Sequence, residues 1–374
     1  MKYRLIDSVE SLEQARAALE GSTQLYLDTE FESNRNGTRL CLLQVSRGHE
    51  VLLIDAVKLP DLTTLRPVFE NPTTEWVLHA GVQDVHLIAQ SMKLSPPPRL
   101  FDTQVAWSMS SAENSVSLSY LQFKLLGVRS SKAHQADDWI LRPLPESQLR
   151  YAASDVEHLP KLAELLIETA KSKQRLELVY QASHEALTPL REPPAPLKLE
   201  SFRNAWQLDA KNQAGLLFLI AWYNGLSADE KRDTPDTKTL LSIASRLPES
   251  IDVLGRIKGV QRNFVQHFGR RVVTGMAEAA RNAKAEDFTP IDPPPYATFA
   301  ETRLDAWLGT LRAEICTGLE VAPEFVLPAR VLKELKFELQ ERGSAGLEAT
   351  LQGFRRALLG PALRAFCDQH PPPL

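Results

Sequence analysis

The sequence has little cysteine, no long apolar run and no excess of basic residues, and each shortage excludes a class of protein. Its 3 cysteines are far apart and odd in number, which argues against a disulfide framework or a zinc cluster and favours a reducing compartment. No apolar run approaches the length of a membrane span, and no secretory signal pattern follows Met1. We therefore expect a cytoplasmic protein without a membrane partner. A net charge of −4 does not by itself indicate nucleic-acid binding, although net charge hides local patches.

The length of 374 residues, with 43% hydrophobic and 24% charged residues, is typical of two or three globular domains. Two proline clusters, at 189–196 and 290–295, are candidate linkers because proline stiffens the chain. We therefore predict three domains. Their expected ranges are 1–190, 197–288 and 297–370.

The first half of the chain alternates strand-like and helical patterns, and the rest, from about Asp155, has the pattern of helices. A turn at 47–49 between two apolar runs predicts a hairpin, and the prolines at 96–98 are expected to end a helix. The predicted strands lie at 25–27, 39–45, 50–55 and 76–79, and the predicted helices at 62–69 and 81–92. A hairpin followed by strand–helix units favours a mixed sheet with helices over its faces.

Four carboxylates lie in three short segments that could meet at one cleft. Asp28 and Glu30 are two residues apart, so on a strand both face the same side, where they repel each other unless a cation lies between them. Asp84 lies near the start of a predicted helix, where a role in balancing the helix dipole is equally reasonable. Asp155 and Tyr151 share one face if their segment is helical, although a solvent-facing helix has the same pattern. Together, the acids suit a hard divalent cation.

The order and local context of these residues resemble the DEDD exonuclease superfamily, in the branch whose third motif carries tyrosine, and within it the ribonuclease D family. The resemblance covers about residues 3–185. The matching motifs are Asp-Thr-Glu-Phe at 28–31, His-Ala-Gly at 79–81 before Asp84, Phe-Asp-Thr at 101–103, Asp-Trp at 138–139, and Arg-Pro-Leu at 142–144 followed by Gln148 and by 151–155.

This resemblance implies an α/β, ribonuclease H-like exonuclease domain, with a mixed sheet flanked by helices. One or two all-α HRDC domains are expected to follow it. Residues 203–206, Trp222 and the Leu-Pro pair at 247–248 match the first HRDC domain. Tyr223 stands where that family usually has arginine, so no nucleic-acid contact is assigned at this position.

The resemblance also implies a mechanism. Asp28, Glu30, Asp84 and Asp155 would hold two divalent metal ions, Mg²⁺ or Mn²⁺, which stabilise the attacking and leaving oxygens. Tyr151 would position the attacking water. The products would be nucleoside 5′-monophosphates, removed stepwise from the free 3′ end of tRNA precursors and other structured RNA. We expect the protein to act as a monomer.

Several other residues near the motifs are candidates for a role. Phe31 could stack on the terminal base, because aromatic faces bind bases with little sequence preference. Arg35 and Gln44 are further candidates for substrate contact. His79 ends an apolar strand, so a hydrogen-bonded core histidine is favoured over a catalytic one. For Asp102 we favour a helix cap over a supporting role behind the metal ligands.

Arg256, Lys258 and Arg262 form a basic stretch in the first helical domain. They could bind RNA phosphates, or they could be an ordinary solvated helix face. Two other functions stay open: a DNA 3′→5′ exonuclease, and a catalytically silent RNA-binding scaffold. The presence of all four acids and the tyrosine disfavours the scaffold.

Overall fold

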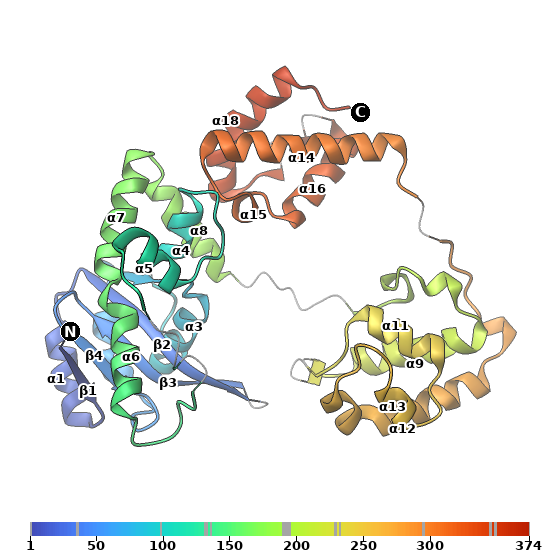
Figure 1. The fold of residues 1–374 in the computed structure, drawn as a ribbon, viewed down its shortest axis with the longest axis horizontal. Helices are drawn as coiled ribbons and strands as arrows, with labels where there is room; N and C mark the ends of the chain where they lie inside the picture. Colours follow the sequence, from blue (N-terminus) through green and yellow to red (C-terminus); the bar gives the residue numbers. More distant parts are fainter. Residues whose placement is uncertain are drawn as a thin grey trace. The chain divides into compact units, whose positions relative to one another are not determined.

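The structure is a computed structural model with two compact units (Figure 1). The first unit contains residues 1–34, 38–190 and 298–374, and the second is built around residues 191–297. The residues described are 2–34, 37–97, 99–130, 134, 137–188, 196–227, 230–231, 233–293, 296–343, 346–347 and 350–373.

A six-stranded mixed sheet forms the centre of the first unit, with strand order β1-β4-β3-β2-β5-β6. β4 runs parallel to β1 and antiparallel to β3, as the predicted hairpin requires, while β2, β5 and β6 are parallel neighbours. The strands are β1 (Tyr3–Ile6), β2 (Gln24–Asn34), β3 (Gly37–Ser46), β4 (Val51–Asp55), β5 (Glu75–Leu78) and β6 (Leu100–Asp102). The predicted α/β fold with a mixed sheet is confirmed.

Helices cover both faces of this sheet. Leu25 and Leu27 of β2 pack with α1 and α3, whereas Tyr26 packs with the helices from α4 onward. This division follows from the alternation of side chains along a strand. The helices are α1 (Val9–Leu19), α2 (Arg66–Phe69), α3 (Val82–Met92), α4 (Thr103–Ser108), α5 (Leu118–Leu126), α6 (Glu146–Glu157), α7 (Leu159–Ser172) and α8 (Leu176–Leu187).

Helix α3 ends at the residue that the predicted range of 81–92 gives. Its last residue is Met92, and Lys93 takes the left-handed conformation with φ 53°. The Lys93 N–H donates to carbonyls of the last turn, which satisfies acceptors that the helix end leaves free. A C-cap, rather than proline, therefore stops this helix.

The last segment of the chain packs within the first unit. Its helices share one hydrophobic cluster with α4 to α8. The Ala322 N–H donates to the Ser108 carbonyl at 2.8 Å, and Arg355 pairs with Glu185 of α8 at 3.4 Å. The helices are α14 (Phe299–Leu319), α15 (Pro323–Val326), α16 (Ala329–Arg342) and α18 (Gly353–Gln369). The division into one exonuclease and two HRDC domains stays a prediction.

The second unit is helical and has its own core. Trp222 lies against Phe264 and Phe268, with ring centroids 5.9 and 5.2 Å apart. Its helices are α9 (Ala210–Asn224), α11 (Thr237–Arg246), α12 (Ile251–Gly255) and α13 (Arg262–Asn282). Within the described ranges of the whole chain, none of the helices has the length and apolar character needed to cross a membrane.

Candidate active site

Three carboxylates from a central strand and one helix converge in the first unit. Asp28 and Glu30 lie on β2, and Asp155 lies in the last turn of α6. One carboxylate oxygen from each lies within 4.8 Å of the other two. The same-face geometry predicted for Asp28 and Glu30 brings both toward α6, which packs against β2 and β4.

Asp84 approaches the same strand from the other side. It is the third residue of α3, and its Oδ1 accepts a hydrogen bond from the Thr29 hydroxyl. Thr29 lies between Asp28 and Glu30 and points to the opposite face of β2. The charge of Asp84 acts to raise the pKa of Asp28, but among the described residues the group whose oxygens all lie within 4.8 Å of one another contains Asp28, Glu30 and Asp155 without Asp84. Sequence reasoning missed Thr29 as the partner of Asp84, because the alternation along a strand predicts the face to which Thr29 points but not which helix packs there.

Tyr151 lies one turn before Asp155 on α6. A hydrogen bond from its hydroxyl acts to lower the pKa of Asp155, so the two side chains share one face as their spacing predicts. The Tyr151 ring packs against His134 and Trp139, with centroids 5.8 and 6.3 Å apart. A cavity of about 410 Å³ opens beside it, lined also by Arg150 and Ser154.

Burial and mutual repulsion make these acids resist ionisation. Burial, followed by the charges of Asp84, Asp155 and Glu30, raises the pKa of Asp28 well above its usual range. Burial and neighbouring acids raise the pKa of Glu30 to about 9. Burial raises the pKa of Asp155 to about 7 and that of Asp84 to about 6, against hydrogen bonds that act to lower both. Such a group of carboxylates is stable in ionised form only beside cations.

Asp102 holds the turn that leads to Asp84. Its carboxylate caps α4 through the Gln104 and Val105 N–H groups, and it also accepts from the N–H groups of Ala80 and Gly81 at 3.1 and 2.9 Å. The cap role favoured from the sequence is confirmed. The second pair of hydrogen bonds fixes the backbone at Ala80 and Gly81, and a supporting role behind the metal ligands stays a prediction.

His79 and Gly81 are structural members of the same turn. His79 bonds through one ring nitrogen to the Thr103 hydroxyl and through the other to the Val116 carbonyl, both at 2.9 Å, as expected for a core histidine. Gly81 has no room for a side chain, because a Cβ there would lie 2.5 Å from the Cβ of Leu78.

The other candidates for substrate contact have different outcomes. Phe31 is 38% exposed near the end of β2, so its ring is available to a base. Gln44 is fully buried, and neither of its amide atoms has a hydrogen-bond partner among the described residues. A direct contact between Gln44 and substrate is therefore not supported by its position. Arg35 lies outside the described residues.

The basic stretch lies in the second unit. Arg256 directly follows α12, Lys258 lies in the next loop and Arg262 begins α13. All three are exposed. Among the described residues they have no salt-bridge partner, so their charges are available to a ligand.

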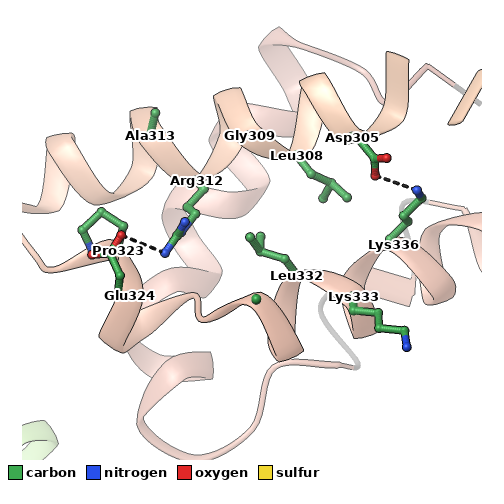
Figure 2. Close-up of a pocket in the computed structure, with 11 residues that line it drawn as sticks. Asp305, Leu308, Gly309, Arg312, Ala313, Pro323, Glu324, Leu332, Lys333 and Lys336 are labelled. Atoms are coloured by element: carbon green, nitrogen blue, oxygen red, sulfur yellow. Dashed lines mark hydrogen bonds and ion pairs between the residues drawn. The ribbon is translucent and has the colours of Figure 1, made fainter. Parts of the chain in front are cut away.

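A larger hollow in the last segment has a different character. It measures about 580 Å³ and lies between α14 and α16. Figure 2 shows that its charges largely neutralise each other: Arg312 pairs with Glu324 at 3.3 Å and Lys336 with Asp305 at 2.6 Å. Such paired charges do not make a site for an anion.

Known proteins resemble the chain over its whole length. The sequence profile of a 3′-5′ exonuclease family matches residues 3–169. Ribonuclease D of Gluconacetobacter diazotrophicus is 30% identical over 378 residues, covering 97% of this chain and 92% of that protein. Ribonuclease D of Escherichia coli is 25% identical and covers 99% of this chain and 100% of its own length.

Solved structures share the fold. The crystal structure of Escherichia coli RNase D aligns with a TM-score of 0.72 at 22% identity, covering 99% of this chain and 100% of that one. The catalytic core of RRP6 from Trypanosoma brucei aligns with a TM-score of 0.58 at 24% identity, over 75% and 80% of the two chains. With its sequence identity over nearly the whole length and its 3′-5′ exonuclease profile, this chain belongs to the ribonuclease D family.

Proposed function

We propose that this 3′→5′ exoribonuclease trims tRNA precursors and other structured RNAs, releasing nucleoside 5′-monophosphates by two-metal hydrolysis. The observation that carries the proposal is the group of Asp28, Glu30 and Asp155, which each offer one carboxylate oxygen within 4.8 Å of the other two. The relative of known structure from Escherichia coli is described as an exoribonuclease involved in structured RNA processing, which supports the choice of substrate.

The donor set fits hard divalent cations. All four candidate ligands are carboxylates, which Mg²⁺ and Mn²⁺ prefer to softer donors. Raised pKa values of Asp28 and Glu30 indicate that a cation is needed to keep these groups ionised together. We propose that Asp28, Glu30, Asp84 and Asp155 hold two such ions. When bound, the ions would supply charge stabilisation and an activated water.

Tyr151 contributes a neutral hydroxyl. Burial, followed by the charges of Asp155, Glu30 and Asp28, raises its pKa above the usual range, so the phenol stays protonated at neutral pH. It therefore orients a water by hydrogen bonding and does not act as a base. Phe31 offers its exposed ring to the 3′-terminal base.

The second unit supplies affinity in this proposal. Arg256, Lys258 and Arg262 are exposed cations that can neutralise RNA phosphates, which makes binding weaken as salt rises. They lie on a unit with its own core, so binding and cutting can be altered separately.

A 5′-labelled tRNA with a 3′ extension tests the activity and its substrate. With Mg²⁺ or Mn²⁺ we expect a ladder that shortens one nucleotide at a time, nucleoside 5′-monophosphates as products, and no cleavage in EDTA. A DNA strand of the same sequence is the matched substrate. Degradation of the DNA at the same rate would favour the DNA exonuclease instead.

Asp28→Asn and Asp155→Asn are the control variants for this assay. Each removes one charge while keeping nearly the same shape, so RNA binding should persist while cleavage is lost. Cleavage by either purified variant at the original rate would contradict the assigned site. Cleavage that continues in EDTA would contradict metal dependence.

A further inference from the structure

Arg142 joins three parts of the exonuclease fold through one guanidinium. Its Nε and Nη2 donate to the two carboxylate oxygens of Asp55, both at 2.7 Å, and Nη2 also donates to the Cys41 carbonyl at 3.0 Å. Its Nη1 donates to the carbonyls of Trp139 and Leu141 at 2.7 and 2.9 Å. The contacts link β3, the end of β4 and the segment that precedes α6.

Asp55 is fixed as firmly as Arg142. It is buried, and its Oδ1 also accepts from the N–H groups of Val57 and Lys58 at 3.1 Å. The side chain of Asp55 is 2% exposed and that of Arg142 is 14% exposed. A planar, bidentate pair of this kind defines both distance and orientation. The ion pair therefore fixes the position of Arg142 Nη1, which donates to backbone carbonyls.

The ion pair of Arg142 and Asp55 fixes the backbone around Trp139. Arg142 binds the Trp139 carbonyl, and on the other side Glu32 of β2 accepts the Trp139 N–H at 3.1 Å. The indole is 2% exposed and lies 6.3 Å from the Tyr151 ring. Helix α6 fixes the Cα of Tyr151, but neighbouring side chains set its ring torsions. Trp139 is the buried neighbour whose backbone N–H and carbonyl are both hydrogen-bonded.

We propose that Arg142 and Asp55 are positioning residues for the reaction: by fixing the backbone at 139–141, they hold Trp139 so that the Tyr151 hydroxyl is aimed at the acid site. This inference rests on the proposed role of Tyr151. Arg142 directs its donors to Asp55 and to backbone carbonyls, so its effect passes through Trp139 rather than through the substrate.

The test compares three variants, Arg142→Lys, Tyr151→Phe and the double variant. Steady-state kinetics on a short RNA gives kcat and KM for each. Lysine keeps the charge but cannot reproduce the planar fork. For Arg142→Lys we expect a loss of about 10- to 100-fold in kcat, the range for a small misplacement of a reacting group. KM and the dependence on Mg²⁺ concentration should stay unchanged. In the Tyr151→Phe background, Arg142→Lys should add little further loss, because both act at the same hydroxyl.

Arg355→Lys is the matched control. Arg355 also pairs with an acid, Glu185, and donates to two backbone carbonyls, those of Phe325 and Val326, at 3.2 and 3.0 Å. It lies between α8 and the last segment rather than beside Tyr151. A general loss of rigidity would lower kcat in both lysine variants, whereas a positioning role lowers it only in Arg142→Lys.

Trp139→Phe changes the contact with the Tyr151 ring and leaves the Arg142–Asp55 ion pair in place. It tests the positioning role even if Arg142→Lys does not fold. It should show the same loss in kcat and the same lack of additivity with Tyr151→Phe. Wild-type kcat in the folded variants, or losses that multiply with Tyr151→Phe, would overturn the positioning role and leave the proposed function intact. Full activity of Tyr151→Phe alone would instead overturn the role of Tyr151.

Discussion

Replacing Asp155 by asparagine should stabilise the metal-free protein at neutral pH while weakening its stabilisation by metal. Asp155 lies within 4.8 Å of the carboxylates of Asp28 and Glu30, and its burial raises its pKa to about 7. Asparagine removes the charge that repels those neighbours and still offers an acceptor to the Tyr151 hydroxyl. A residue whose role is to bind metal can lower the stability of the metal-free protein, so replacing it should raise that stability.

The magnitude follows from the difference in proton affinity between the folded and unfolded chains. The pKa of an aspartate in an unfolded chain is about 3.9, and burial in the folded chain raises the pKa of Asp155 to about 7. The folded state therefore binds the proton more tightly, and this contribution to stability is present below about pH 4 and is lost as pH rises to about 7. A difference of about 3 in pKa corresponds to at most about 4 kcal/mol. Relaxation of the neighbouring acids reduces this, so we expect a gain of about 1 to 3 kcal/mol at pH 8.

Thermal unfolding in EDTA, measured at pH 4.5, 6 and 8, tests this prediction. The variant should melt above wild type at pH 8, by about 2 to 4 °C for each kcal/mol, and the difference should shrink toward pH 4.5. Added Mn²⁺ should raise the melting temperature of wild type more than that of the variant. Asp102→Asn is the contrast, because it weakens four backbone hydrogen bonds and should destabilise at every pH. Asp155→Asn that is less stable than wild type at pH 8 in EDTA would refute the reasoning.

Four further predictions concern separate parts of the protein. Tyr151→Phe should slow cleavage of RNA while Mn²⁺ binding, measured by calorimetry, stays near wild type; lost binding would give Tyr151 a structural role. Replacing Arg256, Lys258 and Arg262 together by alanine should reduce the slope of log binding constant against log salt by about 2 to 3, and an unchanged slope would return them to an ordinary solvated surface. Removing residues 197–296 should weaken binding of structured RNA but leave short oligonucleotides as substrates. Removing 298–374 should instead lower the melting temperature, since that segment shares a hydrophobic cluster with the exonuclease fold.

Patterns within one element were predictable from the sequence. The apolar runs at 39–45 and 50–55 became β3 and β4 with the expected hairpin. The two-residue spacing of Asp28 and Glu30 placed both acids on one face, and the four-residue spacing of Tyr151 and Asp155 did the same on α6. In each case the period of a strand or helix fixes the direction of the side chains.

Contacts between distant segments were not predictable in the same way. Thr29 and Asp84 meet because α3 packs on the opposite face of β2, which no local pattern specifies. Arg142 reaches Asp55 across 87 positions of sequence, and its family motif gives no sign of that partner. Gln44 is polar in sequence yet fully buried, since its strand is central in the sheet.

The packing of the last segment, 298–374, also depends on contacts between distant segments that the sequence did not predict. Proline clusters predicted its boundary near residue 293, and its helical pattern predicted a module. The pairing of Arg355 with Glu185, and the bond from Ala322 to Ser108, join helices that are far apart in sequence. Such contacts depend on the assembled surfaces of both segments rather than on the pattern within either one.

Calorimetric titration of Mn²⁺ into the wild-type protein and into Asp28→Asn tests the central claim most directly, because it measures whether carboxylates from β2 and α6 jointly hold divalent cations. The wild-type protein should bind the ion, and the variant should lose measurable binding while keeping its circular dichroism spectrum. A folded Asp28→Asn protein that binds Mn²⁺ with the affinity and stoichiometry of wild type would contradict the account.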